Sequence, residues 1–537
     1  MPESAVAEEI LNLTRDFPPV STEAWEGAIA KDLKGADYEK KLVWRTEEGL
    51  GIRPYYRKDA LAGLDAQLQT MPGHYPFVRG VGRGWEIAQD AKPGPQAVRA
   101  DLLHEAGAHA IQELGYAIAA GVERLAALTA TLPVDTIAPQ IEFVFAVGPS
   151  YFIEIAKLRA ARVLWALAVD AFGSGDDGAC RMRLHVRTPQ RNKSAYDRYS
   201  NLLRVTTEAA AAVIGGCDRL TVEPFAFDAH LALNVQRILQ EEAHLDAVAD
   251  PAGGSYYIEA LTDSLAREAW KLFQQIEAEG GYAKALASGA IAKALAETRA
   301  AREKAYSARR RALVGVNNYP SVTEKTPEAE SPAPGPAMPL PQVRIAEPFE
   351  QIRRRTTEHA LASGRYPKVL LLKRGDVKMK GARSNFCFNF FGCAGFDMVE
   401  AEEYAGTDAD LIILCSSDPE YLAFAQEVCA KVKAPVLVAG NPKDQIEALQ
   451  AAGVQGFVHV FSDLIQTLTQ WQDKLGMSPW QGGIAPLAQR RARLDREVRS
   501  NNFPESGVPD STGKSGRTTS RRGATNETGL LEDRLPR

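Results

Sequence analysis

Strand-like and helix-like segments alternate along two separate stretches of this chain of 537 residues, and this alternation constrains the fold most strongly. The cleaner stretch is 366–480, where apolar runs such as KVLLLKRG and ADLIILCSS are each followed by a segment with helical periodicity. Such alternation predicts parallel strands covered by helices on both faces. We therefore expect a doubly wound, flavodoxin-like sheet of five strands here. Any ligand site should lie in the loop after its first strand.

The other stretch lies within 83–319 and is less regular. Its apolar runs predict a sheet whose strands are VRADLL, IEFVFAV, RMRLHV, RLTVEP and HLDAVAD. The run LLHEAGAHAIQELGYAIAAGVERLAAL predicts one long helix, and the region after DPAGGSYY is expected to be helical. In the preceding 1–82, the segment KKLVWRTEEGLGIRPYY predicts a hairpin that turns at Glu48 and Gly49.

Composition marks the remaining boundaries. Proline recurs with Ala, Glu and Ser after residue 320, which predicts an extended linker over 320–365. Beyond Gly483 large apolar residues become rare, so 484–537 is expected to be a disordered tail. The predicted regions are thus an N-terminal segment (1–82), a first α/β region (83–319), the linker, a second α/β region (366–483) and the tail.

Charge and cysteine usage exclude several classes of protein. The net charge of −5 gives no basic face for general binding to nucleic acids, and no apolar run approaches the roughly 20 residues of a membrane span. Six cysteines without a C-x-x-C pair predict reduced thiols and a cytoplasmic location, and the start of the sequence has no signal-peptide pattern. The histidines share no metal spacing, and Cys387 and Cys393 are predicted to be core thiols.

The loop after the first strand of the second region, GDVKMKGARSNF, has no phosphate-binding or dinucleotide signature. Its charged residues, considered alone, predict only a solvated loop.

Several long motifs occur in an order that resembles the methylmalonyl-CoA mutase family. They are PGHYPFVRG (72–80), HEAGAHAIQELGYAIAAGVERL (104–125), IEFVFAVGPSYFIEIAKLRAARVLW (141–165), LQEEAHLDAVADPAGGSYYIEALTDSLAREAW (239–270) and LVGVNNYP (313–320). The resemblance implies a (β/α)8-type substrate barrel joined to a cobalamin-binding domain. It also implies isomerisation of (R)-methylmalonyl-CoA and succinyl-CoA through adenosylcobalamin radical chemistry, in which the cofactor carries the difficult step.

The chain departs from the family where the cofactor would bind. The family places a lower-ligand histidine in a D-x-H-x-x-G loop, and the alignment puts Lys378 at the Asp, Lys380 at the His and Arg383 at the last Gly. A protonated lysine has no lone pair for a metal. The loop that contains Lys378, Lys380 and Gly381 is therefore expected to be a degenerate cofactor site without a metal ligand.

The barrel departs from the family in a similar way. Thr221 stands where catalytic relatives have a histidine, so no catalytic residue is expected in this chain. Arg183 matches a substrate-contacting arginine of the family and is the one candidate for substrate binding. The alternative for Arg183 is a solvated arginine at the end of a strand.

The first region is also short for the family. Few residues separate GRGWEIAQD from HEAGAHA, where the family has several strand–helix units. Five strands cannot close an eight-stranded barrel, so we expect a partial (β/α)8-type barrel. The unpaired edges of such an open sheet favour a covering partner.

These departures make the chain resemble the small (beta) type of subunit in the family. The resemblance implies a non-catalytic chain that stabilises a large (alpha) subunit in a heterodimer, with adenosylcobalamin on that partner and an acyl-CoA as the substrate of the complex. Residues 1–82 are expected to be the segment that contacts the other subunit. Neither nucleic acid nor a membrane is an expected partner. Two alternatives stay open: a self-sufficient acyl-CoA mutase with an atypical cobalamin site, and a CoA-thioester-binding helper that uses Arg183.

Overall fold

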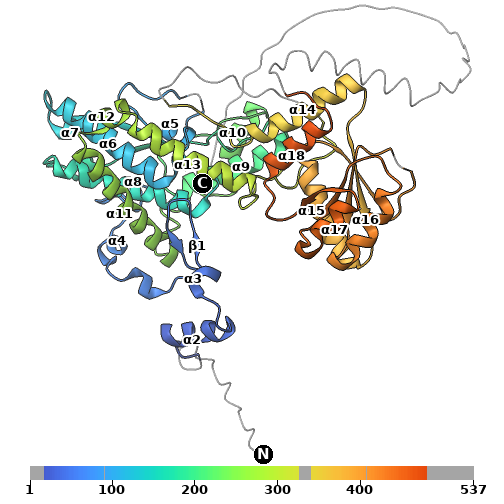
Figure 1. The fold of residues 1–537 in the computed structure, drawn as a ribbon. Coiled ribbons are helices and arrows are strands. Elements are labelled where there is room, and N and C mark those ends of the chain that lie inside the picture. Colours follow the sequence, from blue (N-terminus) through green and yellow to red (C-terminus); the bar gives the residue numbers. More distant parts are fainter. Residues whose placement is uncertain (1–16, 90, 326–339, 407, 480–537) are drawn as a thin grey trace, which may run out of the picture. The chain divides into compact units, whose positions relative to one another are not determined.

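A computed structural model describes residues 17–89, 91–325, 340–406 and 408–479 (Figure 1). Contacts divide the chain into two units, 1–484 and 485–537, and the second lies wholly outside the described residues. The predicted tail therefore also lies outside them. No helix in the described part is both long and apolar enough to cross a membrane.

The first sheet contains five parallel strands in the order β3-β7-β6-β5-β4. Strands β4 to β7 are neighbours in chain order, and β3 then pairs with β7. The pair that would close a ring, β3 with β4, does not form among the described residues, so residues 88–97 connect strands at opposite edges of the sheet. The strands are β3 (Glu86–Ile87), β4 (Val98–Arg99), β5 (Glu142–Ala146), β6 (Arg183–Arg187) and β7 (Arg219–Thr221).

Three predictions for this region are wrong. Of the predicted strand VRADLL, only Val98 and Arg99 are in the sheet, and its remaining residues lie in a helix. HLDAVAD forms no strand, because His244 and Asp250 have positive φ angles and the Asp250 carboxylate accepts from Arg79 and Arg159. The outer strand is instead β3, in GWEIAQD. The predicted long helix is two helices, α5 (Ala100–Glu105) and α6 (Ala110–Thr129), separated at Gly107, whose φ is +117°.

The two faces of the first sheet differ in chemistry. One face presents apolar side chains such as Phe143, Phe145 and Leu184 to the core, together with residues of the surrounding helices. The other presents Glu142, His185, Arg219 and other polar groups, because side chains alternate along each strand. The packed helices are α6, α8 (Tyr151–Ala171), α9 (Arg198–Ile214), α10 (Ala229–Arg237) and α11 (Tyr256–Ala278).

Flanking elements complete this region. The predicted hairpin is confirmed as β1 (Trp44–Arg45) paired with β2 (Gly51–Ile52). The preceding and following helices are α2 (Thr22–Asp32), α3 (Tyr38–Lys41) and α4 (Asp65–Gln69). The helices after DPAGGSYY are α11, α12 (Tyr282–Ala287) and α13 (Ala290–Ser307), as expected.

The second sheet is also parallel and has the order β12-β11-β10-β8-β9, which is 2-1-3-4-5 in chain order. Apolar side chains fill both faces, with α14, α15 and α18 on one and α16 and α17 on the other. Cys387 and Cys393 are buried there, as predicted. The strands are β8 (Lys368–Lys373), β9 (Asp397–Ala401), β10 (Leu411–Cys415), β11 (Val436–Ala439) and β12 (Val454–Val458). The helices are α14 (Glu347–Ser363), α15 (Val377–Gly392), α16 (Tyr421–Cys429), α17 (Ile446–Ala451) and α18 (Leu464–Lys474).

Two further expectations need correction. The linker predicted over 320–365 contains α14, whose buried Phe349 and Ile352 are part of the core; 326–339 lie outside the described residues. The predicted loop GDVKMKGARSNF is mostly the start of α15, because the Asp376 side chain caps that helix by accepting from the Met379 amide. The structure thus confirms a mixed α/β fold with parallel sheets, and the other predicted domain boundaries stay predictions.

Candidate functional site

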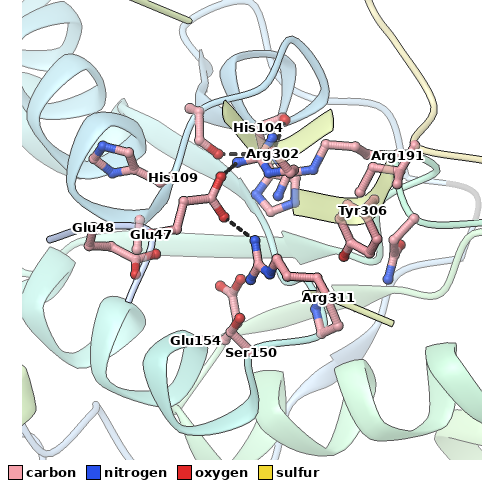
Figure 2. A pocket seen from close by; sticks show the side chains of 15 residues that line it. Glu47, Glu48, His104, His109, Ser150, Glu154, Arg191, Arg302, Tyr306 and Arg311 are labelled. Atoms are coloured by element: carbon pink, nitrogen blue, oxygen red, sulfur yellow. Dashed lines mark hydrogen bonds and ion pairs between the residues drawn. The ribbon is translucent and has the colours of Figure 1, made fainter. Parts of the chain in front are cut away.

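A cavity lies beside the carboxyl ends of the strands in the first sheet, the edge at which parallel α/β folds usually bind ligands (Figure 2). Its cavity volume is about 30 Å³, enough for a water molecule. The charged and aromatic residues that line it are Glu47, Glu48, His104, His109, Glu154, Arg191, Arg302, Tyr306 and Arg311.

A buried charge network lies behind one wall of this cavity and contributes Glu154 to that wall. The Nζ of Lys157 lies 2.7 Å from Glu113 Oε2 and 2.6 Å from Glu154 Oε2, and it donates to the carbonyl of Ala146 at 2.6 Å. Both carboxylates also accept from backbone amides at the end of β5, from Ala146 at 3.1 Å and from Gly148 at 3.0 Å. The network therefore fixes α6 and α8 to the end of this strand.

His104 extends the network toward the cavity. Its Nδ1 lies 3.0 Å from Glu113 Oε2, and its Nε2 is buried without a hydrogen-bond partner among the described residues. Burial, with the nearby Arg191 and Lys157, holds the pKa of His104 well below its usual value. The ring is thus neutral near pH 7, with Nδ1–H donating to Glu113 and Nε2 left as an acceptor.

Arginines bound to Glu47 form another wall. Arg302 and Arg311 both pair with the Glu47 carboxylate, the latter at 2.6 Å. Burial lowers the pKa of Arg302 to about 10. Burial alone would raise the pKa of Glu47, but the two arginines hold it below its usual value.

These charges neutralise one another, and no nucleophile held by a base stands among the described residues that line the cavity. Within the described ranges, no group of three or more His, Cys, Asp or Glu side chains is placed to hold a metal ion. The sequence pattern does not predict this cavity. Charged residues within the apolar periodicity of α8, among them Glu154 and Lys157, are a signal of buried partners, because a charge in a core-facing position needs one.

The structure does not bring the predicted substrate residue into this cavity. Arg183 begins β6 and is exposed, so it lies at the amino end of the strand, whereas the cavity is at the carboxyl ends. Thr221 is buried at the end of β7, where its hydroxyl donates to the Ala88 carbonyl and receives a 2.8 Å hydrogen bond from His185 Nε2.

Lys378, Lys380 and Gly381 lie on the first turns of α15 rather than in a loop. The Nζ of Lys380 is bound at 2.8 Å to the carboxylate of Glu402. An ion-paired ammonium group has no free lone pair for cobalt, and the sequence has no histidine between His359 and His459. The residues at this position therefore do not fit the lower-ligand role that the family resemblance would require.

Comparison with known proteins places the chain in a family. A family model described as methylmalonyl-CoA mutase matches residues 95–361. A small subunit of methylmalonyl-CoA mutase from Porphyromonas gingivalis is 32% identical, over 88% of this chain and 100% of that protein. The chain belongs to the methylmalonyl-CoA mutase family.

Other members of the mutase family match less of their own length. The small subunit from Streptomyces virginiae is 38% identical over 72% of this chain, which spans 65% of that relative. The methylmalonyl-CoA mutase of Escherichia coli is 39% identical over 40% of this chain and 32% of that protein. The alignment to the Porphyromonas relative has 623 positions and is longer than this chain, so that relative has residues where this chain has none.

Proposed function

We propose that this chain is a small, non-catalytic subunit that stabilises a large, cobalamin-bearing methylmalonyl-CoA mutase subunit. The observation that carries this proposal is the match to a small subunit over that protein's entire length. The chemistry of α15 agrees with it, because Lys380 and Glu402 form an ion pair where a catalytic relative would need an imidazole.

The proposed division of labour places adenosylcobalamin and the acyl-CoA reaction on the partner. The cofactor would supply radical chemistry there, and this chain would supply contact surface. Subunits of this kind bury interfaces well above about 2,000 Å² and are obligate partners. In this proposal the two subunits form a heterodimer in the cytoplasm, and the complex interconverts (R)-methylmalonyl-CoA and succinyl-CoA. Neither nucleic acid nor a membrane has a role in it.

The N-terminal segment 17–82 is the surface that best fits a subunit contact. Its helices α2, α3 and α4 bury no residue. Large apolar side chains in the same segment are exposed, namely Phe17, Val20, Trp25, Trp44 and Met71. Exposed tryptophans in particular are favoured at protein–protein interfaces, where their large rings become buried.

We also propose an evolutionary origin for the two sheets. The ring order of the first sheet, open between β3 and β4 in the described part of the chain, fits a (β/α)8-type barrel that has lost the units between these strands. The 2-1-3-4-5 order of the second fits a flavodoxin-like, degenerate cobalamin-binding domain. Arg183 is retained as a proposed thioester contact only for the helper-protein alternative. Its place at the amino end of β6 favours a solvated arginine instead.

Co-purification tests the proposed function. A tagged chain recovered from its host should bring down a larger, histidine-bearing mutase chain in equal amount, and the isolated chain should retain no corrin absorbance after incubation with adenosylcobalamin. If the isolated chain instead binds adenosylcobalamin and isomerises methylmalonyl-CoA, it is a self-sufficient mutase. In that case the proposal is wrong.

A further inference from the structure

The strand order of the second sheet reverses between β8 and β10. We call the space outside the carboxyl ends of these two strands the crevice. Doubly wound sheets bind their ligands outside the carboxyl ends of the strands at such a point. In this chain two side chains from different helical segments lie at this position and at the neighbouring strand end. They are Arg383 of α15 and Glu420, which directly precedes α16.

Arg383 binds groups that follow β10 and end β11. Its Nη2 donates to Asp418 Oδ1 at 2.6 Å, and its Nη1 donates to the Tyr421 hydroxyl at 3.1 Å and to the Ala439 carbonyl. A Cβ atom on Gly440 would overlap the guanidinium, so the arginine lies directly against the backbone after β11. Its side chain is only 17% exposed.

Tyr421 holds this arrangement together. Its hydroxyl donates to the Ala439 carbonyl at 2.5 Å and accepts from the Ser416 amide at 3.1 Å. Burial raises the pKa of the Tyr421 hydroxyl, so the phenol stays protonated and can donate.

Glu420 closes the crevice from the β8 side. Its Oε2 accepts from the Ser416 hydroxyl at 2.7 Å and from the Ser417 hydroxyl and amide, and these bonds lower its pKa to about 2. A Cβ atom on Gly375, in the turn after β8, would overlap the Glu420 carboxylate. The carboxylate therefore occupies the space between the turns that follow β8 and β10.

We propose that Arg383 and Glu420 form a built-in stopper that closes this crevice to a nucleotide-like ligand, including the nucleotide tail of cobalamin. The inference rests on the proposed function and adds a second barrier to it, which acts independently of the missing histidine. The stopper is made of ionised groups with satisfied hydrogen bonds, so an entering ligand would have to break all of them at once. Restoring the metal ligand alone is then insufficient for cofactor binding.

The test compares variants of the full chain by equilibrium dialysis against adenosylcobalamin, with the retained corrin absorbance as the readout. Lys378→Asp/Lys380→His supplies a carboxylate–imidazole pair, and we expect it to retain no more cobalamin than the unchanged chain. Adding Arg383→Ala and Glu420→Ala to this background should raise retention at least tenfold. Retention by the ligand-restored variant alone would overturn the stopper.

A matched control uses another arginine at the same edge. Arg374 pairs with Glu427 and stacks over the Phe424 ring, and it does not reach Gly440. Arg374→Ala on the ligand-restored background should leave cobalamin retention unchanged. An increase equal to that of the stopper variant would show that general loosening of this edge is the cause, which contradicts the proposal.

Circular dichroism and melting temperature establish that each variant is folded. If Arg383→Ala prevents folding, Glu420→Ala alone on the ligand-restored background opens the Gly375 side and should give partial retention. A folded stopper variant that retains no cobalamin overturns the inference but leaves the proposed function standing. Binding by the unchanged chain would contradict the proposed function itself.

Discussion

Buried charges in the first region are stabilised by their partners and not by water. Lys157 is fully buried in α8, yet burial, which would lower its pKa, is outweighed by Glu113 and Glu154, and the net pKa is raised. The same carboxylates bind backbone amides at the end of β5 and the ring of His104. Each member therefore depends on the others, and removal of one leaves an uncompensated charge.

Replacing Lys157 tests this dependence. Lys157→Met should lower the free energy of unfolding by about 3–5 kcal/mol, because Glu113 and Glu154 lose their shared counter-charge in a buried site. Lys271→Met is the control, since Lys271 pairs with Glu268 and its side chain is 64% exposed; a change below about 0.5 kcal/mol is expected. Denaturant unfolding measures both, and equal effects would contradict a special role for the buried network.

His185 should make stability depend on pH. Burial lowers its pKa to about 4 from an ordinary value near 6.5, so the unfolded chain gains a proton between these values and the folded chain does not. The contribution of neutral His185 to the free energy of unfolding is therefore complete above about pH 6.5. It decreases as the pH falls toward 4, by at most about 3 kcal/mol. His185→Gln keeps a donor toward Thr221 and should flatten the fall in unfolding free energy across this window. Parallel curves for the two chains would show that His185 does not titrate in this way.

At the scale of elements, close packing fixes how the helices cover the first sheet. Helix α6 approaches β5 and α8 at Gly121, where a Cβ atom would lie 2.5 Å from the Phe143 ring and 3.0 Å from the Trp165 ring. Gly381 on α15 has the opposite environment, since no heavy atom of a packed neighbour lies within 4 Å of the position that a Cβ atom would take. Two helical glycines thus differ only in what surrounds them.

These glycines predict opposite effects of the same substitution. Gly121→Ala should destabilise the chain by about 1–3 kcal/mol, because overpacking against two aromatic rings exceeds the gain in helix propensity. Gly381→Ala should stabilise it by about 0.5–1 kcal/mol, because only propensity changes there. Thermal unfolding distinguishes the two, and destabilisation by Gly381→Ala would reveal a packing contact that the structure does not contain.

The sequence predicts elements well where the local pattern and the tertiary structure agree. Strands β8, β10 and β11 were predicted because both their faces are apolar, which gives uninterrupted apolar runs. The start of α15 was missed because a helix cap, Asp376, resembles a loop residue in a charged context. The helix break at Gly107 depends on a positive φ angle, and the loop at Asp250 depends on a positive φ angle and on ion pairs with arginines distant in sequence. Hydrophobic periodicity carries no information on either feature.

The candidate cavity is harder to predict from the sequence than these elements, because it depends on contacts between distant parts of the chain. That Lys380 offers no lone pair to a metal can be predicted from the sequence, because that statement depends on residue chemistry alone. The sequence does not indicate that His104, Glu154 and Glu47 converge on one cavity, because they come from separate elements. Arg183 was selected by resemblance, and the structure places it at the opposite end of the strand from that cavity.

At the scale of the whole molecule, the described residues combine two parallel sheets with an N-terminal segment whose helices α2, α3 and α4 bury no residue. The first sheet ends in two very short edge strands, β3 and β4, whose outer sides have no strand partner among the described residues. The N-terminal segment carries exposed tryptophans at positions 25 and 44. Both features favour a chain whose native form includes a partner.

The exposed tryptophans make the proposed contact measurable. Trp25 is 46% exposed and touches only groups of its own segment in the ring contacts observed, Tyr55 and Arg57, while Trp44 is 53% exposed. Trp25→Ala/Trp44→Ala should therefore change the melting temperature of the isolated chain little. It should reduce the amount of large chain that co-purifies with the tagged chain at least fivefold, because buried tryptophans often dominate interface energies.

Leu203→Ala, at a 69% exposed position on α9, is the control and should leave this amount unchanged. If both variants recover as much large chain as the unchanged protein, the contact does not depend on these tryptophans. The open edges of the first sheet would then be the next surface to mutate.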